Sequence, residues 1–279
     1  MFNEEDDEDD INPLAMLLSD HRANDGKRST VQNQGALEPQ LQRHYIASVD
    51  STVVIRQLPS QGLSFQLWPA ATTLVTLLDE HRRHPGTSPL SPTLSALSDG
   101  PNRRPLKVLE LGSGTGLVGI VAAATLGAKV TVTDLPHVIP NLQFNAGANG
   151  SVSTANGGVV QVAPLSWGEA DDVEEVGREF DLIIASDVVY HDHLYEPLLK
   201  TLQNLLLGEG QGRMVMVMAH LRRWKRESAF FKKAKKVFEV EVLHVDRPCD
   251  GSRVGVIVYR FAGKQGRKLN VVSGSAKGV

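Results

Sequence analysis

A short apolar strand that runs into alternating glycines constrains the fold of this chain more than any other feature. Val108–Leu111 has the composition of a buried strand, and glycines follow at positions 112, 114 and 116. Leu117–Leu126 then has the spacing of an amphipathic helix that ends at Gly127. Glycines allow a sharp turn and close approach of a ligand, while the helix start offers unpaired amide groups. This order predicts the first βα unit of a parallel α/β sheet with a ligand-binding turn at its carboxyl edge.

Strand and helix patterns alternate along the rest of the chain. Further strands are predicted at Lys129–Thr133, Val159–Ala163, Asp181–Ser186 and Arg213–Ala219. Helices are predicted at Pro136–Asn149, Leu194–Leu207 and Glu227–Phe238. Val240–Asp246 and Arg253–Phe261 follow as two strands joined through Pro248–Gly251, which is typical of a hairpin. The order predicts a mostly parallel α/β sheet with an antiparallel edge strand.

The segments before the glycine turn divide into a leader, an accessory and an insertion. Tyr45–Gln57 and Leu63–Trp68 have strand composition, so residues 41–68 are predicted to form a small N-terminal β accessory. A helix is expected from Pro69 to about Glu80. The Pro/Ser-rich residues 85–105 are predicted to be a mobile insertion. We expect one folded domain over 41–262, between a disordered acidic and polar leader, 1–40, and a flexible tail, 263–279.

Charge and composition limit the class of protein. Seven acids lie between Glu4 and Asp10, so the net charge of −3 leaves +4 on the remaining sequence. Such a block is expected to be a disordered, solubilising tail. The 41% apolar content argues against disorder of the whole chain, and no apolar run is long enough for a membrane span or a secretory signal. Cys249 is the only cysteine, which excludes an internal disulfide and a cysteine-based zinc site. We therefore expect a cytoplasmic protein that is small enough to enter the nucleus.

The glycine turn does not fit a dinucleotide-binding protein well. A nicotinamide fingerprint needs a third glycine three positions after Gly114, where this chain has Leu117, and no Walker lysine follows. Asp134 stands directly after the second predicted strand, where a carboxylate can accept hydrogen bonds from both hydroxyls of a ribose. The alternative is that the turn merely packs a helix on a strand and that Asp134 is a capping residue.

The pattern Glu110-x-Gly112-x-Gly114-x-Gly116, together with Asp134, resembles the first motifs of class I S-adenosylmethionine-dependent methyltransferases. Further motifs agree in order with the methyltransferase-like 21 group of seven-β-strand protein-lysine methyltransferases. They are Leu67–Ala71, Leu109–Ile120, Thr133–Pro136, Leu165–Gly168 and Asp181–Tyr190. The resemblance covers about Tyr45 to Phe261. It departs at the insertion between Arg82 and Lys107, and at Ser186, where many relatives have alanine.

This resemblance implies a Rossmann-like, seven-stranded methyltransferase domain with helices on both faces, and S-adenosylmethionine as its cofactor. It places Gly112–Gly114 against the amino acid part of the cofactor, Asp134 against its ribose and Trp167 against its adenine. Trp68 and Ser186 complete the pocket, although Trp68 is equally compatible with a packing role. The predicted cofactor-binding residues are Trp68, Glu110, Gly112, Ser113, Gly114, Asp134, Leu135, Trp167 and Ser186.

The resemblance also implies an activity, which is methyl transfer to a lysine ε-amine of an intracellular protein such as a chaperone or a translation factor. Asp187 and Tyr190 of the Asp-x-x-Tyr motif are the predicted catalytic residues. A lysine amine with a pKa of about 10.4 is protonated at neutral pH and must lose that proton before it attacks. Asp187 can accept a hydrogen bond from the amine, and Tyr190 can supply a ring wall and a hydroxyl. The residues leave open whether one of them or a water takes the proton. The alternative is that Asp187 caps a helix.

Two other polar groups have less specific interpretations. His191 and His193 lie beside Asp187 and Asp192, but no further ligand pattern completes a metal site, and no metal is expected. The basic segment around Trp224 could face nucleic acid, be a solvated helix face, or dock an acidic protein, and the last two are favoured. Its bases are Arg222, Arg223, Lys225, Arg226, Lys232, Lys233, Lys235 and Lys236, and Glu227 is the only acid among them. A monomer with a protein substrate, and without membrane or nucleic acid partners, is the expected assembly.

Other functions remain as alternatives at this stage. Val188-Val189-Tyr190 replaces the Pro-Pro-aromatic loop of many nucleobase amino-methyltransferases, and Cys249 is far from the site for carbon-5 methylation. Small-molecule or RNA methylation, and a non-catalytic module that binds S-adenosylmethionine, are the main alternatives. A nicotinamide oxidoreductase is a weaker one because of the missing glycine.

Overall fold

The computed structural model describes residues 39–98, 104–208, 214–248 and 255–264. Its strands are β1 Gln40–Ile46, β2 Ser51–Gln57, β3 Lys107–Leu111, β4 Lys129–Asp134, β5 Val159–Pro164, β6 Leu182–Ser186, β7 Val215–His220, β8 Phe238–Val245 and β9 Ile257–Gly263. Its α-helices are α2 Pro69–Arg83, α3 Ser91–Ser98, α4 Leu117–Leu126, α5 Ile139–Ala148, α6 Gly150–Thr154, α7 Ala170–Val176, α8 Tyr195–Leu206 and α9 Ser228–Val237. None of the helices in these ranges combines the length and the apolar character that a membrane span requires.

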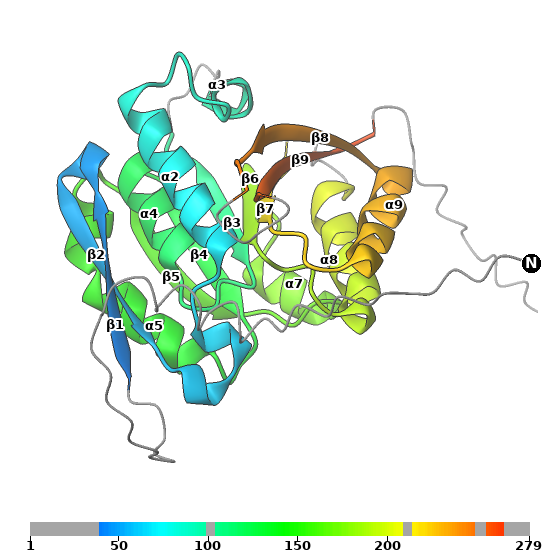
Figure 1. Cartoon of the computed structure of the whole chain (residues 1–279), viewed down its shortest axis with the longest axis horizontal. Coiled ribbons are helices and arrows are strands. Elements are labelled where there is room, and N and C mark those ends of the chain that lie inside the picture. Colours follow the sequence, from blue (N-terminus) through cyan, green and yellow to red (C-terminus); the bar gives the residue numbers. More distant parts are fainter. Residues whose placement is uncertain (1–38, 99–103, 209–213, 249–254, 265–279) are drawn as a thin grey trace, which may run out of the picture.

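The strands form a seven-stranded sheet and a separate two-stranded hairpin (Figure 1). The sheet order is β5-β4-β3-β6-β7-β9-β8, and β5 to β7 pair in parallel. β9 is antiparallel to both of its neighbours and lies one position in from the edge strand β8. The predicted fold class, a Rossmann-like and mostly parallel sheet with helices on both faces, is confirmed. The predicted antiparallel edge is also found, because the edge strand β8 pairs antiparallel with β9.

Two apolar cores lie on the two faces of the sheet. One core joins α2, α4 and the hairpin strand β2, and the other joins α7, α8 and α9. Figure 1 shows α2, α4 and the hairpin on one side and α8 and α9 on the other. Residues Leu117 to Thr125 of α4 are all buried, so this helix is not the amphipathic surface helix that its spacing predicts. The reason is that α2 and the hairpin cover its outer face.

Several local predictions were wrong. Leu63–Trp68 contains a 3₁₀ turn, η4 (Leu63–Phe65), rather than a strand. The insertion predicted as a loop contains the helix α3, and α6 and α7 were not predicted at all. The leader up to residue 38, the turn at 249–254 and the tail from residue 265 lie outside the described residues, as does the 99–103 part of the insertion.

The hairpin is attached to the sheet domain by a ladder of asparagine side chains. Asn141, Asn145 and Asn149 stand four residues apart on α5 and the turn after it, so they lie on one face. Asn149 bonds the amide and the carbonyl of Val54 at 2.8 and 2.8 Å. Asn145 bonds those of Arg56 at 2.9 and 3.1 Å. The ladder satisfies the outer edge of β2, which would otherwise have unpaired backbone groups.

Asn145 also connects this ladder to the glycine turn. Its side-chain amide donates to the carbonyl oxygen of Thr115 at 2.9 Å, and the residue is 0% exposed. The accessory hairpin therefore holds the loop between β3 and α4 as well as covering the core.

We predict that Asn145→Leu lowers the free energy of unfolding by about 2–3 kcal/mol, because it removes the hydrogen-bond partner of the Arg56 amide and of the buried Thr115 carbonyl. Denaturant unfolding of the purified protein measures this. Gln143→Leu, at an exposed position of the same helix, is the matched control and should change stability by less than about 0.5 kcal/mol. Equal losses in the two variants would contradict the role given to the ladder.

Candidate active site

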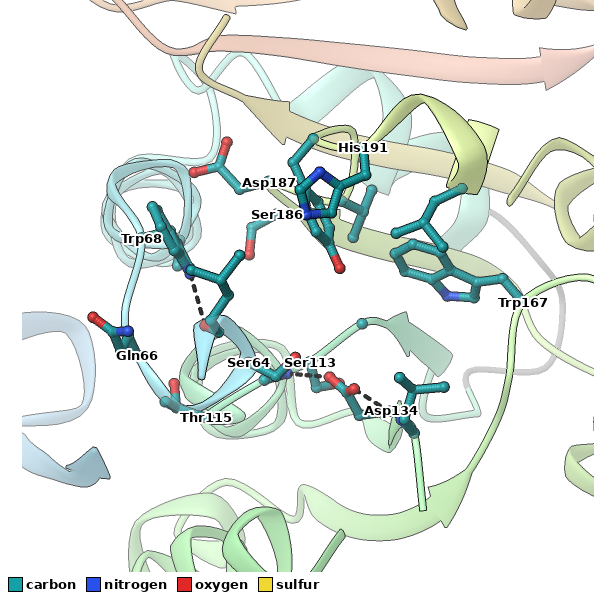
Figure 2. Close-up of a pocket in the computed structure, with 18 of the residues that line it drawn as sticks. Ser64, Gln66, Trp68, Ser113, Thr115, Asp134, Trp167, Ser186, Asp187 and His191 are labelled. Carbon is teal, nitrogen blue, oxygen red and sulfur yellow. Dashed lines mark hydrogen bonds between the residues drawn. The ribbon is translucent and has the colours of Figure 1, made fainter. Parts of the chain in front are cut away.

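A cavity of about 240 Å³ opens at the carboxyl ends of the central strands (Figure 2). Its walls come from η4 and the start of α2, from the loops after β3, β4, β5 and β6, and from the segment after β7. Every predicted site residue except Glu110 lines it, although these residues are far apart in the sequence. Those that it brings together are Trp68, Gly112, Ser113, Gly114, Asp134, Leu135, Trp167, Ser186, Asp187 and Tyr190.

The glycine loop forms the floor of the cavity because it has no side chains at two points of close contact. Gly112 has φ +61°, and a Cβ there would lie 2.8 Å from Cζ2 of Trp167. Gly114 has φ +55°, and a Cβ there would lie 3.0 Å from the carbonyl oxygen of Ser64. Trp167 after β5 and the η4 segment therefore pack directly on the loop backbone. L-residues at either position would strain the loop and push these walls apart.

Asp134 joins the glycine loop to the tip of β4. Its two carboxylate oxygens accept hydrogen bonds from the amides of Gly114 at 2.7 Å and Leu135 at 2.8 Å. Burial raises the pKa of Asp134 above its ordinary value, while these two bonds act in the opposite direction. Each oxygen retains a second lone pair, so the carboxylate can still accept bonds from a diol. Its position therefore suits a ribose, as the sequence predicts.

Glu110 lies behind the loop and does not line the cavity. Its carboxylate accepts a hydrogen bond from the Gly119 amide at 3.0 Å, and the residue is 1% exposed. A Cβ on Gly119 would lie 2.5 Å from this carboxylate, so the missing side chain is what lets α4 approach β3. Burial raises the pKa of Glu110 to about 8. This placement gives Glu110 a role in holding the loop and α4 together.

The η4 segment is a wall that the sequence reading missed. Leu63, Ser64 and Gln66 line the cavity beside Trp68, whose indole Nε1 donates to the carbonyl of Leu63 at 3.0 Å. This bond folds the segment over the glycine loop. Its aromatic and apolar composition is that of a strand, and no residue in it signals the turn.

Asp187 lines the cavity but is engaged with the protein. Oδ1 accepts from the Leu221 amide at 3.0 Å and Oδ2 from the Ala70 amide at 3.3 Å. The Arg223 guanidinium bonds both oxygens, at 3.2 and 3.0 Å. In Figure 2 the carboxylate turns toward the start of α2, whereas the Ser186 hydroxyl points into the cavity. Asp187 thus caps α2, and not the helix that follows it in sequence.

Tyr190 is half-buried at the same edge of the cavity. Burial, and then the charge of Asp134, raise the pKa of its hydroxyl above the ordinary value. The phenol is therefore protonated at neutral pH. The His191 ring lies 4.8 Å from the Tyr190 ring, and the exposed rings of His191 and His193 stack at 5.4 Å. Within the described ranges, no three His, Cys, Asp or Glu residues form a group that could hold a metal.

The charged residues of the cavity do not favour a phosphate-bearing ligand. No lysine lines it among the described residues, and the guanidinium of Arg223 is occupied by Asp187. A dinucleotide or nucleoside triphosphate would need positive charge or free loop amides for its phosphates. The Gly114 amide, which could serve, is bonded to Asp134.

Arg223 also differs from its sequence interpretation. We placed it with the basic segment on a solvated or docking face, but its side chain is only 4% exposed. The other bases of this segment are exposed, namely Arg222, Lys225, Arg226, Lys232, Lys233, Lys235 and Lys236. No local signal identifies it, because the partner of its guanidinium is Asp187, 36 residues earlier in the sequence.

Comparison with known proteins connects this site to a family. The model of the family described as lysine methyltransferase matches residues 48–237. Protein N-lysine methyltransferase METTL21A of Danio rerio is 38% identical over 52% of this chain and 62% of that protein. EEF1A lysine methyltransferase 3 of Xenopus tropicalis is 46% identical over 36% of this chain and 41% of that protein.

These matches span less than two thirds of the length of either relative. Among solved structures, a predicted O-methyltransferase from Agrobacterium tumefaciens aligns with a TM-score of 0.45 and 17% identity, over 62% of this chain and 80% of that one.

We predict that Glu110 makes the stability of the protein depend on pH. Its pKa of about 8 in the folded state lies above the ordinary 4.5, so the folded protein keeps a proton that the unfolded chain releases. The free energy of unfolding should therefore fall as pH rises from about 5 to about 8, by up to about 1.4 kcal/mol per pH unit.

Denaturant unfolding at pH 5.5 and pH 8 tests this prediction in the wild type and in Glu110→Gln. The substitution keeps an acceptor for the Gly119 amide and removes the titrating group. The wild type should gain about 3 kcal/mol more than the variant on acidification. Parallel pH dependences in the two proteins would show that Glu110 has an ordinary pKa.

Proposed function

The chain belongs to the lysine methyltransferase family, and from this membership we propose that it transfers a methyl group from S-adenosylmethionine to the ε-amine of a lysine in an intracellular protein. The observation that carries the proposal is the cavity at the carboxyl edge of the sheet. The glycine loop, Asp134 and Trp167 meet there with the residues that follow β6. The cavity therefore has a donor side, formed by the glycine loop, Asp134 and Trp167, and an acceptor side, formed by the residues after β6.

The residues on the donor side suit a nucleoside that has no phosphates. Asp134 would accept hydrogen bonds from the ribose, the backbone of Gly112–Gly114 would lie along the amino acid part, and Trp167 would offer a face to the adenine. Bound in this way, S-adenosylmethionine supplies a methyl group on a positively charged sulfur. Trp68 and Ser186, with Leu135, would close the remaining walls.

The acceptor side binds and orients an amine. Tyr190, Trp68 and Trp224 supply aromatic walls that exclude water and can contact the apolar methylene groups of a lysine side chain. The oxygens of Asp187 are already bonded and the Tyr190 phenol keeps its proton, so neither is suited to take a proton from the amine. We propose that the proton leaves to water, and that Tyr190 acts by orienting the amine.

A protein is the acceptor that best suits the surroundings of the cavity. The exposed bases between Arg222 and Lys236 flank Arg223 and Trp224, which line the cavity, and such charge would attract an acidic protein surface. Because one relative is named for EEF1A, we propose a translation elongation factor as the first substrate to test, and a chaperone as the second. We further propose a cytoplasmic monomer, a location and state in which both substrate classes are accessible.

Transfer of labelled methyl from S-adenosylmethionine into a eukaryotic cell lysate tests the proposal. We predict one or a few labelled proteins, with the label on methyl-lysine in mass spectra. Asp134→Asn should reduce the labelling rate at least tenfold at limiting donor, because the ribose loses a charged acceptor. Asp171→Asn, at an exposed position on α7, is the control and should match the wild type.

Other distributions of the label would support other functions. Label only in RNA or in small molecules would contradict the lysine assignment. Donor binding without any labelling would favour a non-catalytic binding module.

A further inference from the structure

Arg223 is a buried cation that touches three walls of the cavity. Its guanidinium bonds both carboxylate oxygens of Asp187 and donates to the Leu221 carbonyl at 3.2 Å. The same group lies 5.0 Å from the centre of the Trp68 ring, within the range of a cation–π contact. One side chain thus joins the loop after β6, the segment after β7 and the start of α2.

A second buried acid fixes the backbone of Arg223. The Arg223 amide donates to the carboxylate of Glu227 at 2.9 Å, and Glu227 is 0% exposed. The ring of His220 lies between the two acids, with Nε2 3.2 Å from Glu227 and Nδ1 3.9 Å from Asp187. Buried charges persist when they are paired, so these groups constrain one another. The conformation of Arg223 is therefore fixed.

The pairing changes what Asp187 can do. A carboxylate offers about four acceptor positions, and Asp187 receives four donors, two from Arg223 and one each from the amides of Leu221 and Ala70. Asp187 also has φ +53°, a conformation that residues with side chains adopt only when their surroundings hold them. The arrangement therefore fixes the turn after β6 and leaves no free oxygen for an amine.

We propose that Arg223 is a positioning residue for methyl transfer, which holds Asp187 in place and cancels its charge so that the acceptor amine can enter the cavity neutral. This inference rests on the proposed function. An unpaired carboxylate beside an amine stabilises the ammonium form, and the ammonium nitrogen has no lone pair with which to attack the methyl group. The bidentate ion pair between Arg223 and Asp187 neutralises the carboxylate, so that it no longer stabilises the ammonium form. Arg223 does not touch the reacting atoms.

The pH profile of turnover separates this role from a purely structural one. It is measured as kcat from pH 6.5 to 9.5, with saturating donor and the purified lysate protein that the wild type labels. The other titratable groups beside the pair are His220 and Glu227, and Asp134, Tyr190 and His191 line the same cavity; all of them are kept. Melting temperature and S-adenosylhomocysteine affinity are recorded for each variant.

Two substitutions should move the profile in opposite directions. Arg223→Met leaves Asp187 unpaired, so the half-maximal pH should rise by about one unit and kcat at pH 7.5 should fall about tenfold. Asp187→Asn leaves Arg223 unpaired, and its positive charge should lower the half-maximal pH of the amine. Arg223→Lys keeps the positive charge but cannot form the bidentate pair, and its half-maximal pH should lie between those of Arg223→Met and the wild type. Arg43→Met, at an exposed position of the hairpin strand β1 and away from the basic segment, should match the wild type.

The inference would be overturned if the pH profiles of all variants superimpose once each is scaled to its maximum, and if the losses of kcat follow the losses of melting temperature. Arg223 would then have only a packing role. If Arg223→Met does not fold, Asp187→Asn and Arg223→Lys still test the inference. It requires that the half-maximal pH of kcat falls in Asp187→Asn and rises in Arg223→Lys. A wild type that binds donor but labels no protein would overturn the proposed function, and the inference with it.

Discussion

The close approach of three walls to the glycine loop is the constraint on which the rest of this site depends. Trp167 reaches the loop at Gly112 and the η4 segment reaches it at Gly114, because neither position has a side chain. Asp134 then ties the same loop to β4 through the Gly114 amide. With these contacts, the loop becomes the floor of a cavity whose walls come from distant parts of the sequence. A larger residue at either glycine would separate the walls that the cavity needs.

A second constraint is the burial of charge on the acceptor side. Asp187, Arg223 and Glu227 are almost inaccessible; Asp187 and Arg223 pair with each other, and Glu227 accepts a hydrogen bond from the Arg223 amide. This network assigns roles that chemistry alone leaves open. Asp187 shapes the turn after β6 and Tyr190 keeps its proton, and we propose that the proton of the amine leaves to solvent. In the proposed function, the exposed bases on either side of Arg223 carry the charge that would attract a protein substrate.

The sequence predicts the regular part of this fold well, because strands and helices of a parallel sheet alternate with clear apolar periods. α4 begins and ends at the predicted residues, Leu117 and Leu126. Asp134 is found at the predicted strand end because a parallel sheet brings such ends to one edge. The sequence also contains the four-residue spacing of the asparagine ladder. The edge of β2 to which these asparagines bind is known only from the folded structure.

The failures have a common physical origin. The η4 segment has strand composition, but its backbone bonds are local, and its position depends on a glycine loop some fifty residues later. Arg223 has the composition of a solvated face, and its burial depends on Asp187, 36 residues earlier. Glu110 fits the motif of a ligand-binding acid, yet it is held behind the loop by the Gly119 amide. In each case a contact formed only in the folded structure determines the position, and the local sequence pattern does not indicate it.

Equilibrium binding tests the central claim, that this cavity holds a nucleoside without phosphates, most directly. The measurement is calorimetric titration of the wild type and of Gly112→Ala with S-adenosylmethionine and with NAD. The account predicts that the wild type binds one equivalent of S-adenosylmethionine, that Gly112→Ala binds it much more weakly because Trp167 and the loop separate, and that NAD does not bind. Binding of NAD in preference to S-adenosylmethionine, or equal affinity of both proteins for S-adenosylmethionine, would contradict it.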